Sequence, residues 1–319
     1  MSQSPATTTP VTKYDRLIAA AQSAGPALTV VVHPCEASAL KGAIGAAEAG
    51  LITPILVGPE ARIRAVAAEH DVELDGIEVV DAEHSHGSAA AAIALIRAGR
   101  GELLMKGSLH TEELMHAVTA SATGLRTARR ISHVFVMDVP GRADSLFITD
   151  AAINIFPDLD AKRDIVQNAI DLYRAIGRGE PRVAILSAVE TVTRKIPSTI
   201  DAAALCKMAD RGQITGGVLD GPLAFDTAID AEAARVKGII SPVAGRAQIL
   251  VVPDLEAGNM LAKNLTFLSK ADAAGVVLGA RVPIVLTSRA DSVRARLASC
   301  AATSLYAAAR RRGDTVAWV

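Results

Sequence analysis

Three polar side chains with different chemistry follow a short apolar run near the end of the chain. The segment from Pro283 to Asp291 reads PIVLTSRAD, so the hydroxyl of Ser288, the guanidinium of Arg289 and the carboxylate of Asp291 are close neighbours. Ser288 and Asp291 have the spacing of a capping box, in which hydroxyl and carboxylate each accept from a backbone N–H at a helix start. The first interpretation is therefore a strand that leads into a capped helix.

The same segment also has the composition of an anion site. A helix that starts at the end of a parallel strand offers free N–H groups and the positive end of its dipole. Arg289 adds a planar cation that can bind two oxygens of one phosphate. Ser288, Arg289 and the helix start are therefore predicted to face a phosphate-bearing or phosphate-like substrate.

The elements that must position these residues alternate along the chain. Short β-branched runs such as LTVVVHP, ITPILVGP and IEVVDA are separated by alanine-rich patterns such as ASALKGAIGAAEAG and EARIRAVAAEHD. This alternation is typical of βαβ units around a mostly parallel sheet and predicts an α/β protein. A helix capped by Asp160 is expected to end at Gly177, and residues 274 to 288 are expected to form one strand.

Further polar residues follow predicted strands, where open α/β sheets hold their ligands. Asp150 and Asn154 either line a substrate pocket or cap a turn, and Asp220 and Asp254 either belong to a ligand site or shape tight turns and helix starts. Both interpretations stay open at this point. His133 is interpreted as a hydrogen-bonded core residue.

The composition of the 319 residues excludes several classes of function. Lys plus Arg total 33 against 34 for Asp plus Glu, and no basic block is interleaved with aromatic residues, so nucleic acid is not an expected partner. No P-loop or dinucleotide-binding motif occurs, and three dispersed cysteines favour neither a zinc site nor disulfides. No apolar stretch approaches the roughly 20 residues of a membrane span. We expect a cytoplasmic protein of two domains with no metal, no membrane association and a flexible tail over residues 1–12.

Five longer segments together resemble the phosphate acetyl/butyryltransferase family. They are GLRTARRISHVFVMD, ITDAAINIFPDL, PSTIDAAALCKMADRGQITGGVLDGPLAFDTAI, SPVAGRAQILVVPDLEAGNMLAK and PIVLTSRADS. The resemblance runs in order from about Leu28 to Ala308, and D-G-x-x-x-F-D-x-A-I and V-P-D-L-x-A-G-N are its most specific parts. In detail the chain is most similar to the butyryltransferase-like branch and to the transferase half of fused enoyl-CoA hydratase/phosphate acyltransferase proteins, and it is expected to be the transferase alone.

The resemblance implies an activity and an architecture. The activity is reversible transfer of a short acyl group, acetyl or butyryl, between coenzyme A (CoA) and inorganic phosphate in a ternary complex, with no resident cofactor. The fold is expected to be similar to isocitrate and isopropylmalate dehydrogenases, with two α/β/α domains and a central cleft. Residues 1–142 and 277–319 would form domain I, and residues 143–276 would form domain II, through which members of the family form homodimers.

The resemblance also assigns roles within the segment that ends at Asp291. Ser288 and Arg289 match the family's Ser-Arg pair, with the serine near the reacting carbonyl and the arginine on phosphate. The acetyltransferases carry an aspartate seven residues after that serine, where this chain has Ala295, so Asp291 is the alternative base. Ser288, Arg289 and Asp291 are therefore the predicted catalytic residues.

Substrate-binding residues are implied in the same way. Arg126 and Arg130 follow the butyryltransferase-like pattern, and Arg126 is the first candidate for phosphate or for the phosphates of CoA. The remaining candidates are Asp150, Asn154, Asp220 and Asp254.

Two other functions stay open at this stage. One is a same-fold enzyme that acts on another phosphorylated ligand or on an acyl carrier protein, such as an acyl-ACP:phosphate transferase or a phosphohydroxythreonine dehydrogenase. The other is a degenerate acyl-CoA-binding protein, because Ala295 and His116 stand where the acetyltransferases carry aspartate and arginine.

Overall fold

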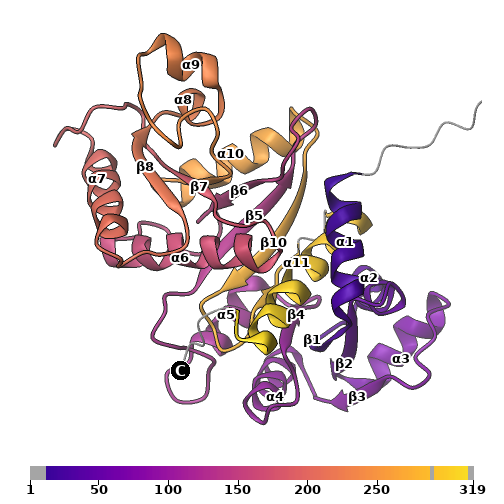
Figure 1. Ribbon diagram of the computed structural model, residues 1–319. Coiled ribbons are helices and arrows are strands. Elements are labelled where there is room, and N and C mark those ends of the chain that lie inside the picture. Colours follow the sequence, from indigo (N-terminus) through magenta and orange to yellow (C-terminus); the bar gives the residue numbers. More distant parts are fainter. Residues whose placement is uncertain (1–11, 288–290, 315–319) are drawn as a thin grey trace, which may run out of the picture.

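One large mixed sheet forms the centre of the computed structural model, which describes residues 12–287 and 291–314 (Figure 1). The strands are β1 (Ala27–Val32), β2 (Ile52–Gly58), β3 (Glu78–Asp81), β4 (Leu103–Lys106), β5 (Ser132–Asp138), β6 (Leu146–Thr149), β7 (Arg182–Leu186), β8 (Val218–Leu223), β9 (Ile249–Val251), β10 (Asp272–Leu278) and β11 (Ile284–Val285). The helices are α1 (Lys13–Ala24), α2 (Ala37–Glu48), α3 (Glu60–Glu69), α4 (Ser85–Arg97), α5 (Thr111–Thr119), α6 (Leu159–Ala175), α7 (Pro197–Asp210), α8 (Phe225–Ile229), α9 (Ala231–Val236), α10 (Leu255–Phe267) and α11 (Val293–Arg312).

Two parallel groups of strands meet in the middle of the sheet. The strand order is β3-β2-β1-β4-β11-β10-β5-β6-β9-β7-β8. The strands from β3 to β11 run parallel to one another, and so do those from β6 to β8. The three central pairs, β11–β10, β10–β5 and β5–β6, are antiparallel, so the second group runs opposite to the first. The loops after β6 and β9 therefore leave the sheet at the opposite end of the strands from the loops after β4 and β11.

The single strand expected over residues 274 to 288 was wrong. The chain turns between β10 and β11, which pair antiparallel through Val276 and Val285. Gly279 in this turn has φ +87°, and a Cβ there would lie 2.3 Å from the backbone oxygen of Arg130. The turn is therefore fixed by a backbone that is remote in sequence.

The helices cover the two faces of the sheet differently. On one face α1, α2, α3, α6, α7 and α11 share one hydrophobic core, and α11 contacts both α1 and α6 (Figure 1). On the other face α4 and α5 pack over the first group of strands, whereas α8, α9 and α10 pack over the second. The middle of this second face lies between two separate hydrophobic cores.

Helix α11 starts later than the capping box predicts. Its N-cap is Ser292, whose hydroxyl oxygen accepts from the N–H of Ala295 at 3.1 Å. The expectation that Ser288 and Asp291 cap this helix was therefore wrong, because a serine closer to the buried alanine stripe supplies the hydroxyl. Ser288 and Arg289 lie outside the described residues. Helix α6 is likewise capped by Asp158 and not by Asp160.

The strands near the end of the chain return to the first group. β11 inserts between β4 and β10, and α11 packs against α1 and α2. This arrangement accommodates a discontinuous first domain, and the boundaries at residues 142 and 277 stay a prediction. Within the part of the chain that the structure describes, none of the helices has the length and apolar character to span a bilayer.

Gly107, directly after β4, offers a test of backbone packing. A Cβ at this position would lie 2.2 Å from the oxygen of Val32 and 2.6 Å from that of His33, and neither backbone atom can move alone. We expect Gly107→Ala to lower the free energy of unfolding in urea by about 1–3 kcal/mol. The control Gly45→Ala in α2, where no atom lies within 4 Å of the new Cβ, should raise it by roughly 0.5–1 kcal/mol. Equal effects of the two substitutions would contradict the packing described here.

Candidate functional site

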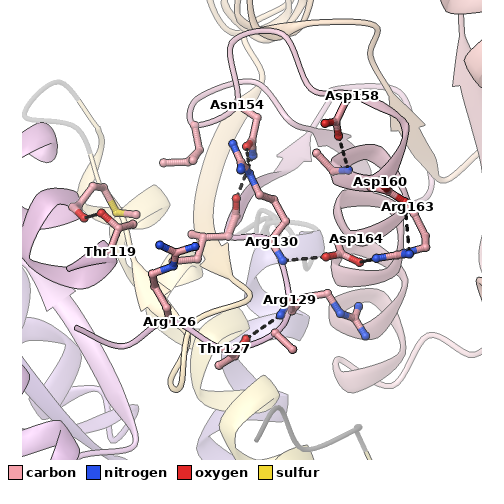
Figure 2. A pocket seen from close by; sticks show the side chains of 15 residues that line it. Thr119, Arg126, Thr127, Arg129, Arg130, Asn154, Asp158, Asp160, Arg163 and Asp164 are labelled. Carbon is pink, nitrogen blue, oxygen red and sulfur yellow. Dashed lines mark hydrogen bonds and ion pairs between the residues drawn. The ribbon is translucent and has the colours of Figure 1, made fainter. Parts of the chain in front are cut away.

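Two cavities lie on either side of residues 150–154. The first, here called the central cavity, has a volume of about 560 Å³ and lies between α5 and α10. The second, the arginine cavity, has a volume of about 490 Å³ and lies between α5 and α6 (Figure 2). Ala152 lines the central cavity, whereas Ile153 and Asn154 line the arginine cavity. One short loop thus separates two spaces that could hold the two ends of one ligand.

The floor of the central cavity is the middle of the sheet. Phe135 of β5 pairs with Gly275 of β10, and His133 pairs with Val277. Because alternate residues of a strand share a face, His133, Phe135, Ala273 and Gly275 all point to the side on which α5 and α10 lie. The uncovered middle of the second face is therefore the site of this cavity.

The walls of the central cavity carry most of its charge. Lys106, Leu109, His110 and Thr111 come from the end of β4 and the start of α5, and Asn259, Ala262, Lys263, Thr266 and Phe267 come from α10. Leu286, Thr287 and Asp291 complete the wall. The predicted site residue Asp291 thus lies beside the same cavity as Lys106 and Lys263. The predicted Ser288 and Arg289 lie outside the described residues, between Thr287 and Asp291.

His133 is the most buried ionisable group of the central cavity. Its side chain is 1% exposed, its ring packs edge to face on Phe135 at 4.3 Å between centroids, and its Nδ1 has no hydrogen-bond partner among the described residues. Burial lowers the pKa of the imidazole to about 4, although the nearby Asp150 carboxylate acts in the opposite direction. The ring is therefore neutral at pH 7. The expectation of a hydrogen-bonded core residue is confirmed, because the residue is buried and its backbone oxygen accepts from Thr149 Oγ1 at 2.7 Å.

The arginine cavity contains a guanidinium that no described residue engages. Arg130 Nε donates to Asn154 Oδ1 at 2.7 Å, and Arg163 pairs with Asp164 at 3.0 Å. Arg126 lines the same space, and Figure 2 shows its guanidinium directed into the cavity with no interaction drawn to it. Since a guanidinium binds carboxylate or phosphate oxygens in pairs, Arg126 is available to an anionic ligand.

The loop between the cavities is held by Asp150. Its Oδ1 accepts from the N–H groups of Ala152 at 2.9 Å and Ile153 at 3.0 Å, and its Oδ2 accepts from Asn154 Nδ2 at 2.6 Å. Asn154 Nδ2 also donates to the oxygen of Ile131 at 2.9 Å. Asp150 therefore shapes the turn, which is the structural interpretation, whereas Asn154 joins the turn to the wall of the arginine cavity.

The other predicted site residues have structural contacts. Asp254 is the N-cap of α10 and accepts from the N–H of Ala257 at 2.9 Å. Asp220 lies on β8 at the edge of the sheet, accepts from the N–H of Gly221 at 2.8 Å, and does not line either of the two cavities. The structure therefore brings Arg126, Arg130 and Asn154 together but leaves Asp220 and Asp254 apart from them.

Two lysines of the central cavity were not predicted from the sequence. Lys106 is only 9% exposed, and its position at the end of the apolar run LLMK was a signal, because a lysine is rarely buried without a specific partner. Lys263 lies on the exposed side of α10, and its helical pattern contains no comparable signal. Among the described residues, no group of three or more His, Cys, Asp or Glu side chains is arranged to hold a metal ion.

Comparisons with known proteins agree on one family. Residues 86–304 match the family model described as "Phosphate acetyl/butaryl transferase". The chain is 79% identical over 305 residues to a phosphate acetyltransferase of Rhizobium meliloti, which covers 96% of each chain. It is 41% identical to a phosphate butyryltransferase of Clostridium beijerinckii, covering 82% of this chain and 87% of that protein.

A solved structure agrees with this assignment. A branched-chain phosphotransacylase of Enterococcus faecalis superposes with a TM-score of 0.76 at 28% identity, covering 88% of this chain and 99% of the other. The α/β architecture is therefore the one that this relative has.

The neutral His133 should make the stability of the protein depend on pH. The imidazole has a pKa of about 4 when folded, whereas histidine in an unfolded chain titrates near pH 6.5. Between pH 4 and pH 6.5 the unfolded state therefore binds one proton more than the folded state. The contribution of His133 to the free energy of unfolding is complete above pH 6.5 and decreases as the pH falls towards 4, by up to roughly 3 kcal/mol. Urea unfolding between about pH 7.5 and pH 5 should show a smaller loss for His133→Gln than for the unaltered protein. If both proteins lost the same free energy of unfolding over this pH range, folded His133 would bind a proton as readily as unfolded His133, which would contradict the prediction.

Proposed function

The chain belongs to the phosphate acetyl/butyryl transferase family, and from this membership we propose a phosphate acyltransferase that moves a short acyl group reversibly between CoA and inorganic phosphate. The observation that carries the proposal is the 79% identity, over nearly the whole chain, to a phosphate acetyltransferase. The same relative favours acetyl as the preferred acyl group, with butyryl as the second candidate because of the butyryltransferase relative.

The two cavities suggest how CoA could be held. CoA carries its phosphates and its thiol at opposite ends. Arg126 in the arginine cavity suits the phosphates, and the central cavity suits the thiol and the acyl group. Helix α5 lines both spaces, through Thr111 at one end and Thr119 at the other. We infer that CoA passes over the loop of residues 150–154.

Phosphate, the second substrate, would bind near the two lysines of the central cavity and the Ser-Arg pair. Lys106 and Lys263 line the central cavity together with Thr287 and Asp291, which flank Ser288 and Arg289 in the sequence. In our proposal Arg289 and these lysines hold the phosphate, and Ser288 donates to the oxygen of the reacting carbonyl. Donors of this kind stabilise the negative charge that develops during acyl transfer.

Deprotonation of the thiol is assigned to Asp291. The family's usual aspartate is replaced by Ala295, whose buried side chain lies in the first turn of α11. Asp291 precedes that helix and lines the central cavity. The thiolate then attacks the acyl phosphate in a ternary complex, the C–S bond forms and the C–O bond to phosphate breaks. Because both substrates are held in line, we infer that the reaction needs no metal and no resident cofactor.

The proposed assembly is a homodimer formed through residues 143–276, the proposed domain II of an isocitrate dehydrogenase-like fold. Large apolar side chains that are exposed support this proposal, because in the described part of the chain all of them except Val293 belong to these residues. They are Ile155, Phe156, Val192, Ile200, Phe225, Val236, Ile240, Met260, Phe267 and Leu268. Exposed large apolar side chains that are concentrated in one part of a chain are expected where that part forms an interface. A cytoplasmic location stays a prediction.

The proposed function predicts phosphate-dependent release of CoA. Acetyl-CoA, propionyl-CoA and butyryl-CoA are offered with phosphate, and free thiol is titrated over time. Acetyl-CoA should give the highest kcat/KM, and a chelator should leave the rate unchanged. Arg126→Ala should raise the KM for acetyl-CoA about 10- to 100-fold, because a charged hydrogen-bonding pair is lost. The KM of Arg126→Lys should lie between those of Arg126→Ala and the unaltered protein.

Arg100→Ala is the matched control for these substitutions. Arg100 is an exposed arginine that pairs with Glu78 on the outer strand β3 and lines neither cavity. The KM of Arg100→Ala for acetyl-CoA should equal that of the unaltered protein. Absence of thiol release from every acyl-CoA would refute the function, whereas an unchanged KM in Arg126→Ala would refute only the assignment of the arginine cavity.

Phe156 tests the proposed homodimer. Its side chain is 77% exposed, and a charge at a buried interface position opposes association because it must be desolvated. Light scattering after gel filtration should show a dimer for the unaltered protein and a shift towards the monomer for Phe156→Asp. Val293→Asp, an exposed apolar position outside residues 143–276, should leave the dimer intact. A monomeric unaltered protein would contradict the proposal.

A further inference from the structure

His133 is placed to contact a ligand in the central cavity. The ring lies on the floor of that cavity, between the walls formed by α5 and α10. Its Nδ1 is shielded from solvent and has no partner among the described residues, so the nitrogen that a ligand can reach is Nε2. Because a ring proton goes to the nitrogen that can find an acceptor, we assign the proton to Nε2.

The neighbouring strand makes room for this ring. A Cβ at Gly275 would lie 2.8 Å from His133 Nε2 and 2.6 Å from the oxygen of Leu286. The edge-to-face contact with Phe135 fixes the ring from the other side. Only a residue without a side chain at position 275 is compatible with the observed place of Nε2. The imidazole is therefore held in one orientation before any ligand arrives.

The surroundings of His133 suit an uncharged part of a ligand. The cations of the cavity, Lys106 and Lys263, come from its walls, whereas the floor beside the ring consists of Phe135, Ala273 and Gly275. Burial lowers the pKa of His133 to about 4, so at pH 7 the ring is a neutral donor and a poor base. Phosphate groups favour the cationic walls, and a carbonyl oxygen favours the neutral donor on the floor.

We propose that His133 is a catalytic residue that donates a hydrogen bond from Nε2–H to the carbonyl oxygen of the acyl group, which rests on the proposed acyltransferase function. As the thiolate sulfur bonds to the carbonyl carbon, the electron pair of the C=O bond moves to oxygen and the hydrogen bond to His133 strengthens. When the pair returns, the bond between carbon and the phosphate oxygen breaks. His133 keeps its proton throughout, so it acts as an oxyanion donor and not as a general acid.

Substitutions at position 133 test the hydrogen bond by kinetics. His133→Phe removes the donor and keeps an aromatic ring against Phe135, so kcat with acetyl phosphate and CoA should fall about 10²- to 10³-fold while KM changes little. His133→Gln keeps an N–H donor and should recover much of this loss. His70→Phe, at the end of α3 and in the lining of neither cavity, should match the unaltered enzyme. Circular dichroism and thermal unfolding confirm that each variant is folded.

A second measurement needs no variant. The unaltered protein with ¹⁵N-labelled histidine is titrated with acetylphosphonate, an unreactive analogue of acetyl phosphate that keeps its carbonyl. One Nε2–H proton resonance, assigned to His133 by its nuclear Overhauser contact with the adjacent ring of Phe135, should move downfield as the hydrogen bond forms. An unmoved resonance would overturn the proposal even if the substituted proteins failed to fold.

The kinetic outcomes separate this proposal from the function on which it rests. An unaltered enzyme that forms no acyl phosphate would refute both. An active enzyme whose His133→Phe variant keeps its kcat within threefold would overturn the role of His133 alone. A loss confined to KM would also overturn it, because the ring would then bind the ground state as strongly as the transition state.

Discussion

The antiparallel pairing of β5 with β10 holds the two groups of strands in one sheet. It runs in register from Ser132 opposite Leu278 to Asp138 opposite Asp272. Tyr14 of α1 donates to the oxygens of Val136 and Asp272 across this pair. Because the pairing reverses the direction of the second group, the helices on one face separate into two sets. The central cavity is the space that this separation leaves.

The two cavities differ in the charge that they offer a ligand. Arg126 in one of them faces no described partner, whereas the floor of the other is apolar apart from a neutral imidazole. Electrostatic stabilisation is strongest where donors are fixed and water is excluded, and the burial of His133 meets that condition. A ligand with a charged end and an uncharged reactive end fits this division. The family to which the chain belongs acts on ligands of this kind.

The sequence predicts local structure well and remote contacts poorly. The alternation of β-branched runs with alanine-rich patterns predicted the α/β class because each element is encoded within a few residues. The turn at Gly279 was missed because the group that requires a glycine there is the backbone of Arg130. A local motif was enough to suggest Arg126. That its guanidinium lacks a partner among the described residues, and that His133 Nδ1 does too, depends on residues that only the fold brings near.

The loop of residues 150–154 has a consequence for how substrate range could change. Four N–H groups, three of the backbone and one of Asn154, converge on the single carboxylate of Asp150, so this wall resists adjustment. A second wall belongs to α10, where Ala262 and Thr266 line the central cavity and Asn259 donates to the oxygen of Ala151. Side-chain volume at Ala262 and Thr266 can grow or shrink without removing a hydrogen bond of the loop. In the proposed acyl site, substitutions at these two positions of α10 are therefore sufficient to change the accepted length of the acyl chain while the loop stays intact.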